Sequence, residues 1–387
     1  MKKIAFIMQC LTGGGAERTV ANLSLELSKS YDVYIILFDG KRVTYPHNAT
    51  IIDIALPSKS GRFAKVINAI RRINAVRKIK KEYQFDSVVS FMFGANIVNV
   101  LSKRKEQVIT SARNYLSVYG LSKIKLFRER FVARRSDRIV AISEMVKNDL
   151  VENFGLPEEK ITTIYNPCEV EKVLSLAEKT PPLEFDRSCF YFITVGRLVH
   201  QKGQWNLLKS FKLLSEKCDD ARLIVLGSGD LENKLRAMTR DLKIEDRVIF
   251  GGFADNPFSY VKRADVFVLT SLHEGLGNVI LEAMACGKPV ISADCFAGPR
   301  EILAPNTDLK AKAKDVEKCQ YGILVPELPS HEDYSSDYSE EHSILMSAMY
   351  EIYTKQELRE NYARLSLDRI EAFLPEKIAS EWIALLG

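Results

Sequence analysis

Two carboxylates, Glu274 and Glu282, lie eight positions apart in a segment with the chemistry of a ligand site. Glycines follow Glu274 and break helical regularity, whereas helix-favouring residues begin at Asn278. Apolar runs flank the segment, so we expect a strand, a glycine loop, a helix and another strand. Anions bind at the helix N-terminus in such a unit, and an acid in its loop would face sugar hydroxyls. The pattern therefore indicates a nucleotide-sugar site.

Two cations follow another predicted strand in the same half of the chain. Arg197 and Lys202 lie between the apolar run 190–195 and a helical pattern that begins near residue 205. A guanidinium binds phosphate oxygens bidentately and an ammonium acts as a point charge, so the pair suits a diphosphate. The alternative is a solvated pair of surface charges.

A glycine-rich turn follows the first predicted strand. Gly14 and Gly15 belong to a run of three glycines that opens a helix, where the backbone can approach an anionic ligand closely. A plain tight turn is the alternative. The run is not a G-x-G-x-x-G fingerprint and the chain has no G-x-x-x-x-G-K-[ST] loop, which argues against a dehydrogenase or a P-loop enzyme.

Residues 63–81 and 123–138 are basic and helical in pattern. The first stretch carries Arg71, Arg72, Arg77 and Lys78, and we interpret both stretches as surfaces for an anionic membrane or a lipid-linked pyrophosphate. The alternative is that each helix packs on a sheet and leaves a solvated cationic face.

Composition is that of a soluble globular protein. The 387 residues are 46% hydrophobic and 27% charged, and the net charge of +5 is too small to imply nucleic-acid binding. Seven cysteines without a C-x-x-C pair favour a reducing cytoplasm. We expect no bound metal and no cofactor, because the few histidines lack ligand spacing and no Asp-x-Asp pair occurs. The apolar start is read as a first strand rather than a signal peptide, and no apolar run is long enough to span a bilayer.

Apolar strands and helical patterns alternate along the whole chain, which is typical of parallel α/β architecture. A polar segment at 166–187 interrupts the alternation, so we predict two doubly wound domains with the ligand between them. One long helix is expected at 343–373. The polar stretch 303–320 and the acidic stretch 331–342 are expected to be loops.

With these residues in hand, the chain resembles the retaining glycosyltransferases of family 4, which have the GT-B fold. The likeness covers the whole chain and is carried by the paired glutamates, by the glycine turn, and by the Gly-Arg-Leu and Gln-Lys-Gly motifs around Arg197 and Lys202. It implies two Rossmann-like domains facing a central cleft. An acceptor-binding domain would span 1–167, a nucleotide-sugar-binding domain 168–372, and a helix at 373–387 would return to the first domain.

The resemblance also implies roles for individual residues. Arg197 and Lys202 would grip the diphosphate, Glu274 would contact the donor sugar and Glu282 the ribose. The remaining donor contacts would come from Gly14, Gly15, Gly196, Phe253, Ala254, Leu276, Gly277, Asn278 and Val279. A front-face displacement would retain the anomeric configuration, with Glu274 as a covalent nucleophile the alternative. Many relatives have a histidine after the strand that ends near Ser111, where this chain has Arg113, so Arg113 is a candidate substitute.

The activity implied is metal-independent transfer of a hexose or N-acetylhexosamine from a UDP-sugar to a lipid-linked or soluble glycan, in surface polysaccharide or glycan assembly. The enzyme would be cytoplasmic and peripheral at the inner face of the cell membrane. The alternatives are a catalytically silent GT-B partner subunit, a nucleotide-sugar epimerase and a phosphorylase. Side chains of segments 91–96 and 113–120 would decide acceptor and linkage. The sequence does not specify the oligomeric state.

Overall fold

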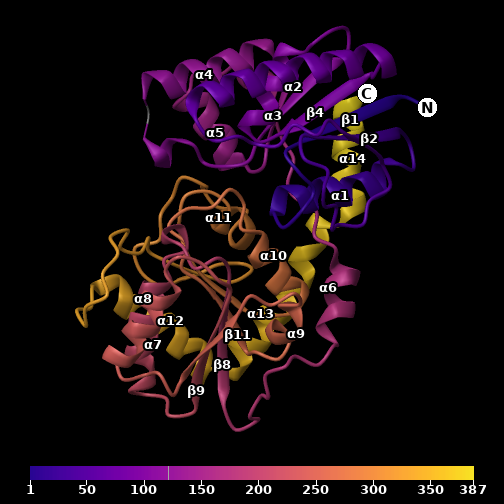
Figure 1. The fold of residues 1–387 in the computed structure, drawn as a ribbon. Coiled ribbons are helices and arrows are strands. Elements are labelled where there is room, and N and C mark those ends of the chain that lie inside the picture. Colours follow the sequence, from indigo (N-terminus) through magenta and orange to yellow (C-terminus); the bar gives the residue numbers. More distant parts are fainter. Residues whose placement is uncertain (121) are drawn as a thin grey trace. The chain divides into compact units, whose positions relative to one another are not determined.

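The computed structural model describes residues 1–120 and 122–387, which divide into two compact units (Figure 1). Unit 1 comprises residues 1–167 and 374–387, and unit 2 comprises residues 168–373. Each unit contains one seven-stranded sheet with helices on both faces. The prediction of two doubly wound, Rossmann-like folds is therefore confirmed.

The strands of unit 1 are β1 (Lys3–Met8), β2 (Asp32–Leu37), β3 (Thr50–Asp53), β4 (Ser87–Phe91), β5 (Gln107–Ala112), β6 (Arg138–Ala141) and β7 (Ile161–Thr163). Its helices are α1 (Gly15–Leu27), α2 (Arg62–Tyr83), α3 (Phe93–Leu101), α4 (Lys123–Arg135), α5 (Glu144–Glu152) and α14 (Pro375–Leu386), with short turns η1 (Ser117–Tyr119) and η2 (Glu158–Lys160). The parallel order β3-β2-β1-β4-β5-β6-β7 reverses direction between β1 and β4.

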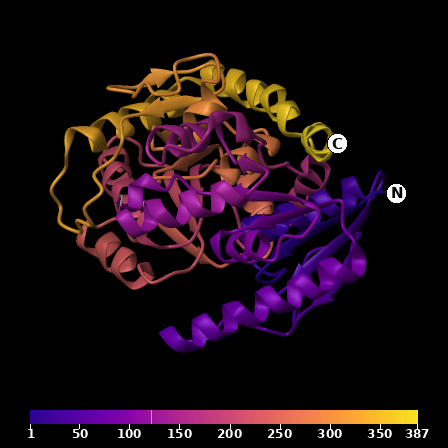
Figure 2. The same ribbon diagram turned by 90° about the horizontal axis from the view of Figure 1, so that it is seen from above.

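Two helical layers bury the faces of this sheet. On one face, α1 and α14 pack over β1 and β2, and the α14 residue Trp382 is 1% exposed with its ring 6.1 Å from that of Phe91. On the other face, α2 and α3 cover a cluster that includes Val76 and Val98, and α4 packs beside α3. In Figure 2, α2 is the long purple helix along one side of this unit.

The strands of unit 2 are β8 (Phe190–Val195), β9 (Ala221–Leu226), β10 (Val248–Gly252), β11 (Val266–Leu269), β12 (Val290–Ala293), β13 (Glu317–Lys318) and β14 (Ile323–Val325). Its helices are α6 (Val170–Ala177), α7 (Gln204–Ser215), α8 (Glu232–Asp241), α9 (Phe258–Val261), α10 (Asn278–Ala285), α11 (Pro299–Leu303), α12 (Glu340–Thr354) and α13 (Gln356–Ile370), with turns η3 (His200–Lys202) and η4 (Glu371–Phe373). The order β10-β9-β8-β11-β12-β14-β13 reverses between β8 and β11, and only β13 among these described strands is antiparallel to its neighbour.

The structure corrects several predicted elements. The expected helix at 343–373 is two helices, because Lys355 has extended backbone angles (φ −101°, ψ 90°) that end α12 and begin α13. The predicted linker at 166–187 contains α6, and the predicted loop at 303–320 contains β13. The short strand β3 and the helix α3 were not predicted. Both are short, with four residues in β3 and nine in α3, and their β-branched residues are compatible with either a strand or a short helix.

Candidate functional site

Two loops of unit 2 meet where its strand order reverses, the place where open α/β sheets bind ligands. One loop runs from Gly196 to Gly203 after β8, and the other follows β11. Gly203 allows their close approach, because it has a φ of +60° and an added Cβ would lie 2.4 Å from the carbonyl oxygen of Thr270. The loops are joined by hydrogen bonds from Leu272 N to Gln201 O (2.8 Å) and from Gln201 Nε2 to His273 O (2.9 Å).

This approach brings Lys202 and Glu274 into direct contact. Lys202 Nζ lies 2.6 Å from Glu274 Oε1, and the two side chains are only 14% and 9% exposed. Ser271 Oγ donates a second hydrogen bond to Glu274 Oε1, at 2.7 Å. Burial lowers the pKa of the neighbouring His273, and Glu274 partly offsets this effect. The sequence placed both Lys202 and Glu274 near a ligand, but it gave no sign of their pairing or of Ser271.

Arg197 differs from Lys202 in its surroundings. It is exposed, and its side chain has no hydrogen-bond or ion-pair partner among residues 1–120 and 122–387. Its main chain is held in place, since Gln204 Nε2 donates to Arg197 O at 3.0 Å. Gly196 lies against the turn after β9, where a Cβ on Gly227 would come within 1.9 Å of Gly196 O. The loop is thus a fixed support for a free guanidinium.

The loop after Glu274 leads into the N-terminus of α10. Gly277 has a φ of +93° and caps the helix, so the N–H groups of Gly277, Asn278 and Val279 belong to a helix start that suits an anion, and Leu276 immediately precedes this cap. Glu282 is half-buried one turn further along α10. After β10, Phe253 is 76% exposed and Ala254 is half-buried. These residues all belong to unit 2.

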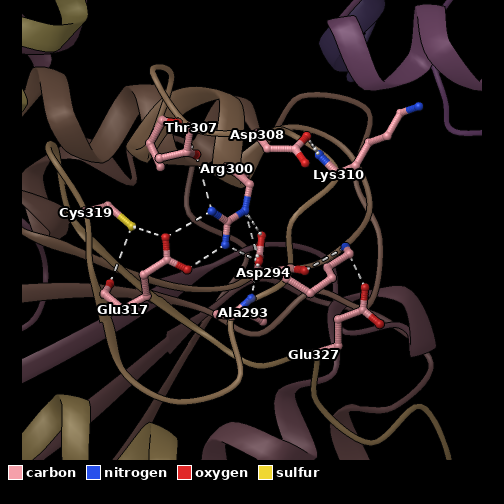
Figure 3. Close-up of polar contacts among 12 residues, drawn as sticks. Ala293, Asp294, Arg300, Thr307, Asp308, Lys310, Glu317, Cys319 and Glu327 are labelled. Carbon is pink, nitrogen blue, oxygen red and sulfur yellow. Dashed lines mark hydrogen bonds and ion pairs between the residues drawn. The ribbon is translucent and has the colours of Figure 1, made fainter.

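A buried ion-pair network around Arg300, shown in Figure 3, was not predicted from the sequence. The Arg300 guanidinium, 4% exposed, donates to Asp294 Oδ2 at 2.6 Å and to Glu317 Oε2 at 2.7 Å. Asp294 begins the segment 294–298, in which Phe296 O accepts the backbone N–H of Glu274 at 3.0 Å. The acidic partner Glu317 belongs to the stretch that was expected to be a loop. No local sequence pattern indicated that it would pair with Arg300.

Three of the predicted residues of unit 1, Gly14, Gly15 and Arg113, follow β1 and β5 at the carboxyl edge of its sheet. Gly14 and Gly15 begin α1, and Thr19 Oγ1 donates to Gly15 O at 2.8 Å. Arg113 follows β5, donates to Asn166 Oδ1, and lies over the Phe91 ring at 5.1 Å. Burial lowers the pKa of Arg113 to about 9, and Glu17 only partly offsets this. Arg113 is thus a desolvated cation near a helix N-terminus.

The basic helices present two kinds of side chain. Arg72 donates to Leu56 O at 2.7 Å and Arg77 to Leu101 O at 2.5 Å, so both hold the fold together. Arg71 and Lys78 are exposed. Several apolar side chains of α2 and α4 also face solvent: Phe63 (88% exposed), Ile67 (52%), Ile70 (54%), Ile124 (72%) and Phe127 (70%).

Among residues 1–120 and 122–387, no cluster of three or more His, Cys, Asp or Glu side chains is suited to hold a metal ion. Over the same part of the chain, no helix has the length and apolar character needed to cross a bilayer.

Two family models match the chain, one on each unit. The model described as Glycosyltransferase Family 4 matches residues 13–172, and the model described as Glycosyl transferases group 1 matches residues 177–323.

Relatives extend this likeness over nearly the full length. An uncharacterized glycosyltransferase of Methanocaldococcus jannaschii is 32% identical over 82% of this chain and 83% of its own. The N-acetylgalactosamine-N,N'-diacetylbacillosaminyl-diphospho-undecaprenol 4-alpha-N-acetylgalactosaminyltransferase of Campylobacter jejuni is 25% identical over 100% of both chains. The Anabaena protein HepE, solved in complex with UDP and glucose, superposes with a TM-score of 0.75 at 18% identity, over 100% of this chain and 99% of its own.

Proposed function

Since the chain belongs to the GT-B glycosyltransferases, we propose that it transfers a hexose or N-acetylhexosamine from a UDP-sugar to a sugar acceptor with retention of configuration. The observation that carries this proposal is the Lys202–Glu274 pair, 2.6 Å apart, which joins the loop of the unpaired Arg197 to the loop after β11. Two cations suit a diphosphate, and a buried carboxylate that already accepts hydrogen bonds suits sugar hydroxyls.

In the proposed reaction the bond between the anomeric carbon and the diphosphate oxygen breaks as negative charge develops on UDP. Arg197 and Lys202 stabilise this charge, together with the N–H groups at the start of α10. The acceptor hydroxyl bonds to the anomeric carbon on the same face, and its proton passes to the departing phosphate oxygen. Configuration is retained without an enzymic nucleophile.

The contacts of Glu274 favour this route over a covalent one. Its Oε1 atom accepts from both Lys202 Nζ and Ser271 Oγ, which draws electron density from the oxygen and lowers its nucleophilicity. The same contacts fix the direction of the carboxylate, so that it can accept hydrogen bonds from donor hydroxyls. Glu274 therefore orients the donor sugar in our proposal, and Glu282, one turn into α10, contacts the ribose.

The experiment is UDP release over a panel of nucleotide sugars, with and without acceptors. Lys202→Ala and Glu274→Gln are expected to lower turnover by about 10²–10³-fold, the effect of losing one transition-state contact. Lys318→Ala is the matched control, because Lys318 forms an exposed 2.6 Å pair with Glu351. Wild-type turnover in both site variants would refute the assignment. Sugar release that requires phosphate, or epimerised donor without transfer, would identify a different reaction.

For the acceptor, we propose a glycan on a polyprenyl diphosphate. The name of the Campylobacter relative describes an acceptor of this kind, and that relative matches the chain from end to end. Arg113, a desolvated cation at the sheet edge of unit 1, is the proposed contact for an acceptor or donor phosphate. Arg113→Met should raise the acceptor KM at least tenfold while leaving UDP affinity unchanged if the contact is to the acceptor.

We further propose that α2 and α4 hold unit 1 to an anionic membrane. Exposed Phe63, Ile70 and Phe127 would enter the interface, and Arg71 and Lys78 would face lipid phosphates.

The double variant Arg71→Glu, Lys78→Glu should lose sedimentation with phosphatidylglycerol vesicles. The double variant Lys243→Glu, Lys314→Glu in unit 2 gives the same change in net charge and should keep it. Equal binding by all three proteins would show that the helices are merely solvated faces.

A further inference from the structure

A cavity of about 130 Å³ lies inside unit 1, where β5 ends beneath α4. Apolar side chains form most of its wall, among them Leu116, Val132 and Leu150. Met92 and Asn114 also line it and are exposed, so the cavity is reached from solvent. It lies between segments 91–96 and 113–120, at the carboxyl edge of the parallel sheet where α/β folds bind ligands.

Two polar side chains in this apolar wall lack partners. Ser111 is 2% exposed, and its Oγ atom has no hydrogen-bond partner among the described residues. The Glu129 carboxyl, also in the wall, makes no hydrogen bond or ion pair within the same residues. Burial raises the pKa of Glu129, and Arg128 and Lys125 only partly offset this. A buried hydroxyl without a partner is costly, so Ser111 points to a ligand that completes it, and the half-buried Glu129 lines the same cavity.

The backbone at the rim gives a second indication of function. Met92 has a φ of +74°, a left-handed conformation that a side chain with a Cβ rarely adopts. Strained residues of this kind cluster at ligand sites, where the surrounding fold holds them in place. Met92 immediately follows β4, one of the two strands between which the order of this sheet reverses.

The size of the cavity limits what it holds. A buried apolar cavity of about 150 Å³ takes a molecule the size of benzene. The 130 Å³ here is therefore suited to a substituent of a few heavy atoms rather than to a whole hexose with its hydroxyls. The substituent must carry an apolar end for the wall, a hydrogen-bond acceptor for Ser111 and a donor for Glu129.

We propose that this cavity receives the acetamido group of the acceptor's sugar, which makes an N-acetylated amino sugar the acceptor class. The Ser111 hydroxyl donates to the acetamide carbonyl oxygen, the Glu129 carboxylate accepts the amide N–H, and the methyl group contacts Leu116, Val132 and Leu150. This assignment rests on the proposed transferase function, and it names the acceptor that unit 1 selects.

The kinetic test compares two polyprenyl-diphosphate acceptors that differ only in a 2-acetamido or a 2-hydroxyl group. Wild-type kcat/KM should be at least tenfold higher for the acetamido acceptor. Ser111→Ala should lower kcat/KM for the acetamido acceptor about tenfold, which corresponds to the loss of one hydrogen bond. It should leave kcat/KM for the hydroxyl acceptor unchanged. Equal use of both acceptors by the wild-type enzyme, or equal effects of Ser111→Ala on both, would overturn the acetamido subsite while the transferase function stands.

A second measurement does not require turnover. Saturation-transfer NMR with methyl N-acetylglucosaminide should show strong transfer to the acetyl methyl protons in the wild-type protein and weak transfer in Glu129→Leu. Equal transfer to acetyl and ring protons would refute the subsite whether or not UDP is released.

Thermal unfolding of the variants shows whether a substitution destabilises the fold. Ser111→Ala breaks no described hydrogen bond and should leave Tm unchanged, whereas Ser136→Ala should lower it, because Ser136 Oγ donates to Val132 O at 2.9 Å. A large decrease in the Tm of Ser111→Ala would show that the Ser111 hydroxyl stabilises the fold, and it would contradict the assignment of this hydroxyl to ligand binding.

Discussion

Replacing Arg300 with alanine tests whether the buried network supports the Glu274 loop. The change leaves Asp294, 1% exposed, as an unpaired carboxylate that keeps one backbone hydrogen bond, from Ala313 N at 2.8 Å. Breaking a buried pair by removing one partner costs about 3–5 kcal/mol. Local opening of segment 294–298 should then increase by a factor of roughly 10² to 4 × 10³, at 1.4 kcal/mol for each factor of ten.

The readout is hydrogen exchange, followed by mass spectrometry, in the peptide that contains Glu274. Its backbone N–H donates to Phe296 O, so opening of segment 294–298 exposes that amide to exchange. Donor KM should rise together with exchange. Asp294→Asn in the Arg300→Ala background should restore part of the protection, because it removes the stranded charge.

Arg364→Ala is the matched control. Arg364 pairs with Asp368 at 3.0 Å, but both side chains are more than half exposed, so the loss should be at most about 1 kcal/mol. If Arg300→Ala accelerates exchange no more than Arg364→Ala, the network does not support the loop and the reasoning fails.

Three further outcomes are expected. Burial lowers the pKa of His342 to about 4, below its unfolded value near 6.5. Between pH 7 and 5 the unfolded chain therefore binds a proton that the folded chain does not, and about 2 kcal/mol of folding stability is lost. The stability of His342→Gln, measured by urea unfolding, should depend less on pH over this range. Gly298→Ala should weaken UDP binding measured by calorimetry, because its Cβ would lie 1.8 Å from Leu276 O, whereas Gly61→Ala, at a similar φ in open space, should not. Trp382→Ala should destabilise unit 1 by about 3–5 kcal/mol and accelerate exchange there but not in unit 2.

The fold was largely predictable because its signals are local and repeated. Parallel strands buried on both faces are continuous apolar runs, and glycines and polar segments separate them from the helices. The loops after β8 and β11 were placed correctly for the same reason, and Lys202 and Glu274 were both singled out. Their contact was not predictable, because nothing in the spacing of residues 72 positions apart specifies a 2.6 Å pair.

Features formed by segments far apart in the sequence were not predicted. Arg300 meets Glu317 only because a polar stretch folds back over β12, and the cavity beside Ser111 exists only once α3, α4 and α5 surround the end of β5. In both cases tertiary packing, rather than local propensity, decides where a polar side chain is buried.

The division of the chain into units affects the entropy cost of assembling unit 1. Unit 1 is interrupted by the whole of unit 2, and its core needs Trp382 from the segment after the interruption. Bringing those ends together across a disordered insertion of 206 residues (168 to 373) would cost roughly 5 kcal/mol of chain entropy. Folded unit 2 removes most of that cost, since Cys168 N donates to Phe373 O at 2.8 Å and its two ends leave side by side. A folded unit 2 therefore brings the two pieces of unit 1 together at little further cost in chain entropy.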